Sequence, residues 1–158
     1  MNSHKFYKLI ASLAAPFVAG GIGGIVTASN ISVWYADLDK PFFNPPNWIF
    51  GPVWTVLYIL MGVALYLAWT ARGRKQQRQM ALTLFGAQLA LNALWSIVFF
   101  GAHLLWGAVI VILALWILIA LTMYAFRPLS RAAMWLLAPY LAWVSFATIL
   151  NTAVALLN

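Results

Sequence analysis

Residues 79–126 of the chain read QMALTLFGAQLALNALWSIVFFGAHLLWGAVIVILALWILIALTMYAF and contain no charged side chain. A helix needs about 20 apolar residues to cross the hydrocarbon of a bilayer, so this stretch is about twice as long as one span. The tripeptide Gly101-Ala102-His103 interrupts it near its middle. The stretch therefore predicts two membrane helices joined by a tight turn.

Three more charge-free stretches are each long enough for one span, at residues 9–36, 41–71 and 132–158. The chain is 65% hydrophobic and 7% charged, and its loops are short. These features predict an all-α integral membrane protein, a five-transmembrane-helix bundle that forms a single domain over residues 1–158. We expect the helices at about 9–28, 48–70, 80–100, 104–126 and 132–156, with a lid loop at about 29–46.

The basic residues are distributed unevenly over this layout. Eight of the nine Lys and Arg residues fall on one side: Lys5, Lys8, Arg72, Arg74, Lys75, Arg78, Arg127 and Arg131. Because short cytoplasmic loops retain Lys and Arg, we expect a cytoplasmic N-terminus, with the C-terminus and the lid loop on the opposite side. The net charge of +7 then sets orientation and meets anionic lipid, and it does not indicate a nucleic-acid partner.

Several classes of chemistry lack the residues that they need. The chain has no Cys and no Glu, and its two carboxylates, Asp37 and Asp39, lie in the lid loop. We therefore expect no metal site, no disulfide, no two-carboxylate hydrolase and no buried proton relay. Lys5 and Lys8 before an apolar run resemble the start of a signal peptide. No convincing small-x-small cleavage site follows, so we interpret the first span as a retained helix.

Aromatic and amide side chains share one stripe on each of three predicted spans, at 100° per residue. The stripes are Trp54 with Tyr58, then Gln88, Asn92 and Trp95, and finally Tyr140, Trp143, Ala147 and Asn151. An unpartnered amide facing lipid is costly, so we expect these stripes to face the bundle interior. They either enclose an apolar cavity for a planar hydrophobic small molecule, or they pair with one another and fill the core.

Two further segments allow two interpretations each. The lid loop contains Trp34, Tyr35 and three prolines, including Pro45, which restrict its backbone. It is either a stiff lid over a cavity or part of an aromatic belt at the headgroups. Gly20 and Gly24 form a Gly-x-x-x-Gly pair, which either forms a dimer seam or packs against another helix of the same bundle.

Three blocks of residues resemble a known family in their order along the chain. The first is Trp34-Tyr35-x-x-Leu38-x-Lys40-Pro41-x-x-Asn44-Pro45-Pro46-x-Trp48, followed by Trp54-x-x-Leu57-Tyr58. The second is Gln88-Leu89-x-Leu91-Asn92-x-x-Trp95, and the third is Pro139-Tyr140-Leu141-x-Trp143-x-x-Phe146-Ala147-x-x-Leu150-Asn151. Together they are similar to the translocator protein family, also called the tryptophan-rich sensory protein or TspO/MBR family.

This resemblance implies a five-helix bundle, often a homodimer, that binds porphyrins such as protoporphyrin IX, haem-related tetrapyrroles and synthetic benzodiazepine-type ligands. No cofactor is required, and porphyrin or haem is the ligand. By the resemblance, Trp54 and Trp143 match tryptophans proposed to act in light-dependent porphyrin breakdown. Tyr35, Pro45, Asn92 and Ala147 match positions that line the pocket, and Trp34 belongs to the covering loop.

These observations predict a membrane receptor or sensor for porphyrins. The candidate ligand-binding residues are Trp34, Tyr35, Pro45, Trp54, Tyr58, Gln88, Asn92, Trp95, Tyr140, Trp143, Ala147 and Asn151. The alternative is a transporter or facilitator of tetrapyrroles or other hydrophobic small molecules, although five spans without buried charge argue against active transport. An enzymatic role is open only as Trp-assisted photo-oxidation. Some members of the family that the chain resembles bind cholesterol and carry a Tyr followed closely by Lys or Arg near the end of the fifth helix. Nothing basic follows Arg131 here, so sterol-like ligands are less favoured.

Overall fold

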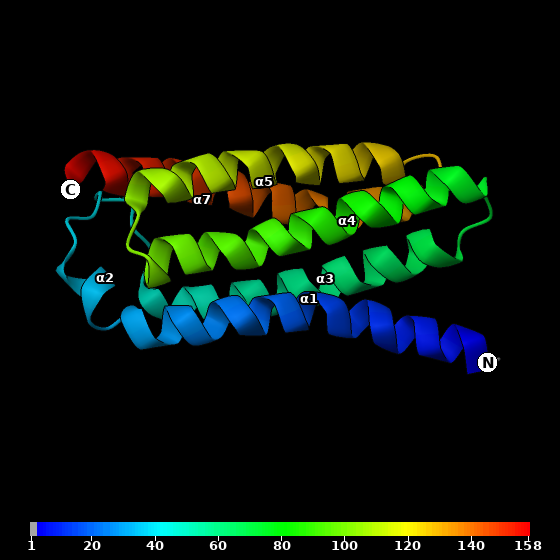
Figure 1. Ribbon diagram of the computed structural model, residues 1–158, viewed down its shortest axis with the longest axis horizontal. Helices are drawn as coiled ribbons and strands as arrows, with labels where there is room; N and C mark the ends of the chain where they lie inside the picture. The colour runs from blue at the N-terminus through cyan, green and yellow to red at the C-terminus, as the bar shows by residue number, and fades with distance from the viewer. Residues whose placement is uncertain (1–2) are drawn as a thin grey trace.

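The computed structural model describes residues 3–158, which form a bundle of long helices without a β-strand (Figure 1). The long helices are α1 (Ser3–Asn30), α3 (Phe50–Thr70), α4 (Lys75–Ser96), α5 (Leu105–Phe126) and α7 (Ala138–Leu157). The short ones are α2 (Trp34–Asp37), the 3-10 turn η1 (Asn47–Ile49), the π-helical turn η2 (Ile97–Gly101) and α6 (Arg131–Leu136).

The prediction of five membrane spans is confirmed. Five helical segments are long and apolar enough to cross a bilayer: Lys5–Asn30, Asn47–Thr70, Lys75–Gly101, Leu105–Phe126 and Arg131–Leu157. The tight turn expected at Gly101-Ala102-His103 separates the third from the fourth, and His103 adopts a positive φ of 57° there. The protein is therefore a multi-pass integral membrane protein.

Two helices, α1 and α4, begin several residues before their predicted spans, next to the Lys and Arg residues of the chain. Helix α4 begins at Lys75, before the expected residue 80, because Lys, Gln and Arg are good helix formers outside the hydrocarbon. The fifth span is divided into α6 and α7, and Pro139 lies in the first turn of α7, where a proline needs no amide partner. The lid loop also contains helix α2, which the sequence did not predict.

The five spans pack as a ring. Helix α1 lies against α3 and α4, α4 against α5, and α5 against α7, while α6 closes the ring by packing on α3. In the fifth span, contact with α3 comes mainly from α6 and only weakly from α7. The ring is therefore tight where α6 lies, and α3 and α7 are separated nearer the lid loop.

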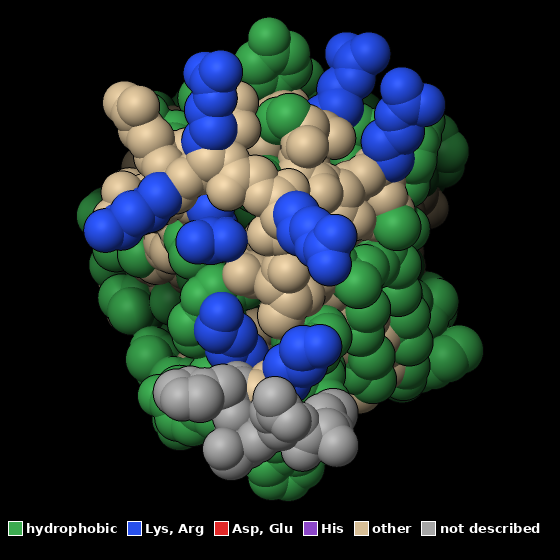
Figure 2. Space-filling view, turned by 90° about the vertical axis from the view of Figure 1, so that its right-hand side faces the viewer, with side chains coloured by type: hydrophobic (Ala, Val, Ile, Leu, Met, Phe, Trp, Pro, Cys, Tyr) green, Lys and Arg blue, Asp and Glu red, His purple; other side chains and the backbone are tan. Residues whose placement is uncertain are grey.

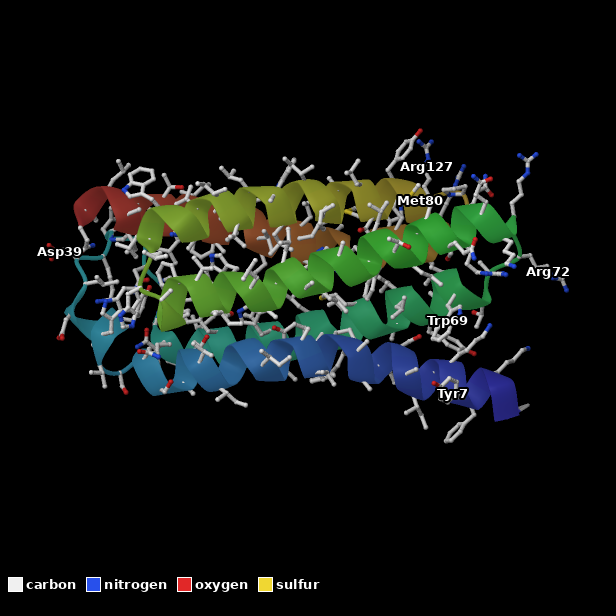
Figure 3. All side chains as sticks on the ribbon, viewed as in Figure 1. Tyr7, Asp39, Trp69, Arg72, Met80 and Arg127 are labelled. Carbon is white, nitrogen blue, oxygen red and sulfur yellow. The ribbon has the colours of Figure 1, made fainter. Side chains whose placement is uncertain are left out.

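The two ends of the bundle differ in charge. The start of α1 and the α3–α4 and α5–α6 connections lie at one end, which we call the basic end; Arg72 and Arg127 mark it in Figure 3. Figure 2 looks onto this end, where Lys and Arg side chains gather. Asp39 lies at the opposite end, the lid end, together with α2 and the end of α7 (Figure 3). The predicted segregation of charge is present in the fold.

Glycines bring α1 and α3 close together toward the basic end. A Cβ at Gly62 would lie 2.9 Å from the Cα of Leu13, and a Cβ at Gly20 would collide with the Tyr58 ring. Gly20 therefore packs within the bundle, as the second interpretation of the Gly20-x-x-x-Gly24 pair expects, whereas a Cβ at Gly24 would meet no atom within 4 Å.

Candidate ligand cavity

A cavity of about 290 Å³ lies inside the lid-end half of the bundle. This volume is at the lower end of the range for small-molecule sites, about 300–1,000 Å³. Its walls come from α1, α2, α3, the end of α4 and α7. The lining residues are small or aromatic for the most part: Gly20, Gly24, Thr27, Ala28, Ile31, Tyr35, Asn47, Phe50, Gly51, Trp54, Tyr58, Trp95, Ser96, Phe99, Phe100, Ala147, Leu150, Asn151 and Val154.

A π-helical turn shapes the wall at the end of α4. In η2 the helix widens, so consecutive Phe99 and Phe100 are both buried on the side that also carries Trp95. The rings of Trp95 and Phe99 stack with centroids 5.6 Å apart and an interplanar angle of 24°. Single π turns are frequent at functional sites in helices. Here the turn adds one aromatic ring to the cavity wall.

Helix α2 of the lid loop covers the cavity. The Tyr35 ring lies 6.0 Å from Phe99, and its hydroxyl donates a 2.8 Å hydrogen bond to Asn44 Oδ1. Burial raises the pKa of Tyr35 to about 12. The ring centroid of Trp34 lies 5.6 Å from that of Phe99, and the Trp34 ring stacks on His103 with centroids 4.2 Å apart. These contacts join the lid loop to the turn between α4 and α5.

The rest of the lid loop is held by hydrogen bonds from polar side chains. Lys40 Nζ donates to the main-chain oxygens of Ala36 (2.9 Å) and Leu38 (2.7 Å). The Asn158 side chain pairs with the backbone of Asp39, accepting from its N–H and donating to its oxygen, both at 3.0 Å. The loop is thereby fixed both internally and to the end of α7.

Three predicted stripes meet at the floor of the cavity, which faces the basic end. The Tyr58 hydroxyl donates to Asn92 Oδ1 at 3.3 Å, and Asn92 Nδ2 donates to the Tyr140 hydroxyl at 3.0 Å. Trp54 stacks on Tyr58 with centroids 5.3 Å apart and meets Tyr140 edge-on at 6.1 Å. Spans two, three and five therefore converge here, as their periodicity predicted.

Of the two amides on the walls, the buried one, Asn151, is already hydrogen-bonded to the protein, and the other, Asn47, is exposed. Trp95 Nε1 donates to Asn151 Oδ1 at 3.1 Å, and Asn151 Nδ2 donates to the Leu105 main-chain oxygen at 3.3 Å. The Thr27 hydroxyl donates to the Gly23 oxygen at 2.9 Å. A molecule in the cavity therefore meets flat apolar faces and few free polar groups.

The lining residues include no Lys, Arg, His, Asp or Glu. Across residues 3–158 no group of three or more His, Cys, Asp and Glu side chains could hold a metal ion. The cavity residues therefore offer neither a metal site nor a conventional acid–base pair, and binding there depends on shape and stacking.

Comparison with known proteins agrees with this architecture. The chain matches the TspO/MBR family over residues 12–157. It belongs to the TspO/MBR family. A tryptophan-rich protein TspO from Archaeoglobus fulgidus is 46% identical over 96% of this chain and 97% of its own length. The resemblance to the TspO/MBR family, which is based on three blocks of the sequence beginning at Trp34, Gln88 and Pro139, is therefore confirmed.

Two relatives with other names are also similar in sequence to this chain. A tryptophan-rich sensory protein from Cereibacter sphaeroides is 38% identical over 100% of this chain and 94% of its own length. The human translocator protein is 43% identical over 77% of this chain and 72% of its own length. The similarity to the Cereibacter protein covers all five spans of this chain.

The structure places six of the predicted TspO/MBR site residues on the cavity wall: Tyr35, Trp54, Tyr58, Trp95, Ala147 and Asn151. Asn92 and Tyr140 lie beneath the floor, where they hold Tyr58 and Trp54 in place. Trp34 lies in the lid helix α2 itself, where it packs against Phe99 and His103. These three residues support the wall residues and do not line the cavity.

Three other predicted residues lie farther from the cavity. Trp143 packs edge-on against Phe50, with ring centroids 6.0 Å apart; Phe50 lines the cavity and Trp143 does not. Gln88 is 1% exposed, does not line the cavity, and its amide has no hydrogen-bond partner among the described residues. Pro45 lies in the lid loop outside the lining set.

The sequence interpretation missed the whole α1 wall. Gly20, Gly24, Thr27, Ala28 and Ile31 carry no aromatic or amide group, so the criterion that found the other walls did not select them. Their spacing of three and four residues does place them on one helical stripe. A stripe of small residues opposite aromatic stripes was the available signal.

Proposed function

We propose that this TspO/MBR protein is a membrane receptor or sensor that binds porphyrins, such as protoporphyrin IX and haem-related tetrapyrroles, in the cavity beneath the lid loop. Two stacked aromatic pairs carry the proposal: Trp54 with Tyr58 on α3, and Trp95 with Phe99 at the end of α4. Flat faces on two different helices suit a flat ligand, and each aromatic contact contributes about 0.5–1.5 kcal/mol beyond the burial of area.

The polarity of the cavity supports the same class of ligand. Its buried amide, Asn151, is hydrogen-bonded to protein, and none of its lining residues is charged. A molecule that needed many hydrogen bonds would leave its polar groups unpaired there, which is unfavourable. The flat ring of a porphyrin incurs no such cost, while its two propionate carboxylates, which find no charged partner among the lining residues, would have to stay outside the cavity.

Transport of tetrapyrroles is the alternative, and one relative is named translocator protein. The packing beneath the floor of the cavity is evidence against transport. Below the Asn92–Tyr140 hydrogen bond, buried side chains such as Met61, Phe85 and Phe126 fill the bundle toward the basic end. A ligand could cross only if the ring of helices parted. We therefore favour binding over passage; flux of protoporphyrin IX into sealed liposomes above that of empty liposomes would reverse this preference.

We propose that the basic end is cytoplasmic, because it carries the Lys and Arg side chains (Figure 2). The chain has no Cys, so single cysteines report orientation cleanly. In intact cells, an impermeant thiol reagent should label Asp39→Cys and spare Lys75→Cys. The opposite pattern would invert the topology.

A homodimer stays a prediction of the family resemblance. Gly20 packs against Tyr58 within the bundle, so Gly20 itself is not free to form a seam between two copies. Native mass spectrometry of the protein released from detergent would show one copy or two.

Binding itself is tested with purified protein in nanodiscs. Protoporphyrin IX should quench the fluorescence of the nine tryptophans saturably, with one ligand bound per chain. Benzodiazepine-type ligands should compete with it. Quenching that rises linearly with porphyrin, as in empty nanodiscs, would indicate partition into lipid and would remove the proposal.

A further inference from the structure

The exposed residues of the cavity wall lie on one side only. The lining residues from α2, the end of α4 and α7 are buried or partly buried. The exposed ones are Gly24 and Ala28 on α1, and Asn47 and Gly51 at the start of span two. The cavity is therefore open sideways, between α1 and α3.

The seam between α1 and α3 changes along its length. Toward the basic end it is closed, since Gly20 packs against Tyr58, and Phe17 also meets the Tyr58 ring at 5.8 Å. Toward the lid it is open, because a Cβ at Gly24 or at Gly51 would meet no atom within 4 Å. The two helices separate just above the Gly20–Tyr58 contact.

The surroundings of this opening are apolar. Ile25, next to Gly24, is 76% exposed, and Trp48, next to Asn47, is 74% exposed. Both belong to segments that are long and apolar enough to span the membrane, Lys5–Asn30 and Asn47–Thr70. The opening therefore faces the acyl chains of the lid-end leaflet, with Trp48 at the depth where tryptophans favour the interface.

Access through the lid is obstructed by comparison. The lid loop is fastened by the Tyr35–Asn44 hydrogen bond and by the pairing of Asn158 with Asp39. His103 also lies 3.1 Å from Asn30 Oδ1 and stacks on Trp34. Lifting the lid breaks these contacts, whereas the side opening requires none of them to break.

We propose that the bilayer supplies the ligand, which enters and leaves through the side opening between α1 and α3. This proposed route rests on the proposed function. It adds where the ligand comes from and which class it belongs to: a planar molecule that partitions into the membrane before it binds. Gly24 and Gly51 keep the opening free because they carry no side chain. A planar analogue that cannot partition into the bilayer is not a ligand if this route is correct.

The test narrows the opening without disturbing the packing. Gly24→Leu and Gly51→Leu place side chains in open space, so folding should be preserved. Gly21→Leu is the matched control on the same helix, because its Cβ also meets nothing within 4 Å and it does not line the cavity. Asn158→Ala, which unfastens the lid loop from α7, tests the competing route.

The measurement is stopped-flow tryptophan quenching by protoporphyrin IX in nanodiscs. Both association and dissociation should slow by about tenfold in Gly24→Leu and Gly51→Leu, a change of about 1.4 kcal/mol in barrier height. Gly21→Leu and Asn158→Ala should match the parent protein. Dissociation that is unchanged or faster in the two glycine variants, or faster in Asn158→Ala, overturns the side route. If the parent protein does not bind porphyrin saturably, the proposed function itself has failed, which is a different outcome.

Discussion

The side-chain amide of Asn92 donates a 3.0 Å hydrogen bond to the hydroxyl of Tyr140, and both residues are buried. This contact joins α4 to α7 beneath the cavity. Tyr58 adds a third helix, because its hydroxyl donates to the same Asn92 side chain. The floor is therefore one hydrogen-bonded unit. Breaking it should lower the stability of the protein as well as alter the cavity.

Replacing Asn92 with Leu should destabilise the protein. The Tyr140 hydroxyl would remain buried without its partner, which costs about 1–3 kcal/mol. The midpoint of thermal unfolding in detergent measures this loss. Adding Tyr140→Phe removes the unpaired hydroxyl, so the double variant should lose less stability than the sum of the two single variants. Strict additivity would mean that the hydrogen bond is not energetically significant.

Replacing Gln88 with Met should stabilise the protein. Met is close in shape to Gln but carries no amide, and the Gln88 amide is buried with no partner among residues 3–158. Relief of an unsatisfied buried amide is worth about 1–3 kcal/mol. Porphyrin affinity should not change, because Gln88 does not line the cavity. Gln79→Met, at an exposed site on the same helix, is the control and should leave stability unchanged. Weaker porphyrin binding in Gln88→Met would instead give this residue the ligand contact that the sequence suggested.

Tyr35 should make the lid sensitive to alkali. Burial raises its pKa to about 12, above the value of about 10 expected in an unfolded chain. Between these values the unfolded chain releases a proton that the native lid retains, so stability falls as pH rises. Below pH 10 the contribution of Tyr35 to the stability of the folded protein is fully present.

The variant Tyr35→Phe isolates this effect, since it removes the titrating group together with the hydrogen bond to Asn44. At neutral pH it should cost about 0.5–1.5 kcal/mol of stability. Its unfolding midpoint should then decline less steeply than that of the parent protein between pH 10 and 12. Parallel decline in the two proteins would show that the Tyr35 phenol titrates as in the unfolded chain.

The two tryptophans singled out for photochemistry should behave differently. Trp54 lines the cavity, whereas Trp143 does not and packs against the lining residue Phe50. We therefore expect Trp54→Phe to slow light-dependent loss of the bound porphyrin absorption band more than Trp143→Phe does. Both variants should be compared at saturating ligand, so that binding differences do not contribute. An equal or larger effect of Trp143→Phe would place the reactive indole outside the cavity wall.

The convergence of spans two, three and five could be predicted from the sequence. Tyr58, Asn92 and Tyr140 lie on apolar helices where an outward amide would be unpaired in lipid, and helical periodicity then determines which neighbours share the inward face. The number of spans followed in the same way from the charge-free stretches. Both inferences depend on rules that act within one helix.

Features that depend on contacts between helices could not be predicted in this way. Asn92 and Tyr140 satisfy each other, which removes them from the wall, and nothing in either helix alone indicates that pairing. The π turn at Ile97–Gly101 arises where α4 meets the lid and α5, and it brings Phe100 inward beside Phe99. The glycine-lined wall of α1 is visible only once the opposing aromatic residues are in place.

The account depends on the ligand occupying the space beside Ala147, and filling that space tests it most directly. The measurement is the affinity of protoporphyrin IX for Ala147→Phe in nanodiscs, with Ala142→Phe, on the exposed face of the same helix, as the control. The account predicts an affinity at least about tenfold weaker for Ala147→Phe, or about 1.4 kcal/mol, and no change for Ala142→Phe. Undiminished affinity in Ala147→Phe, with the protein folded, would contradict it.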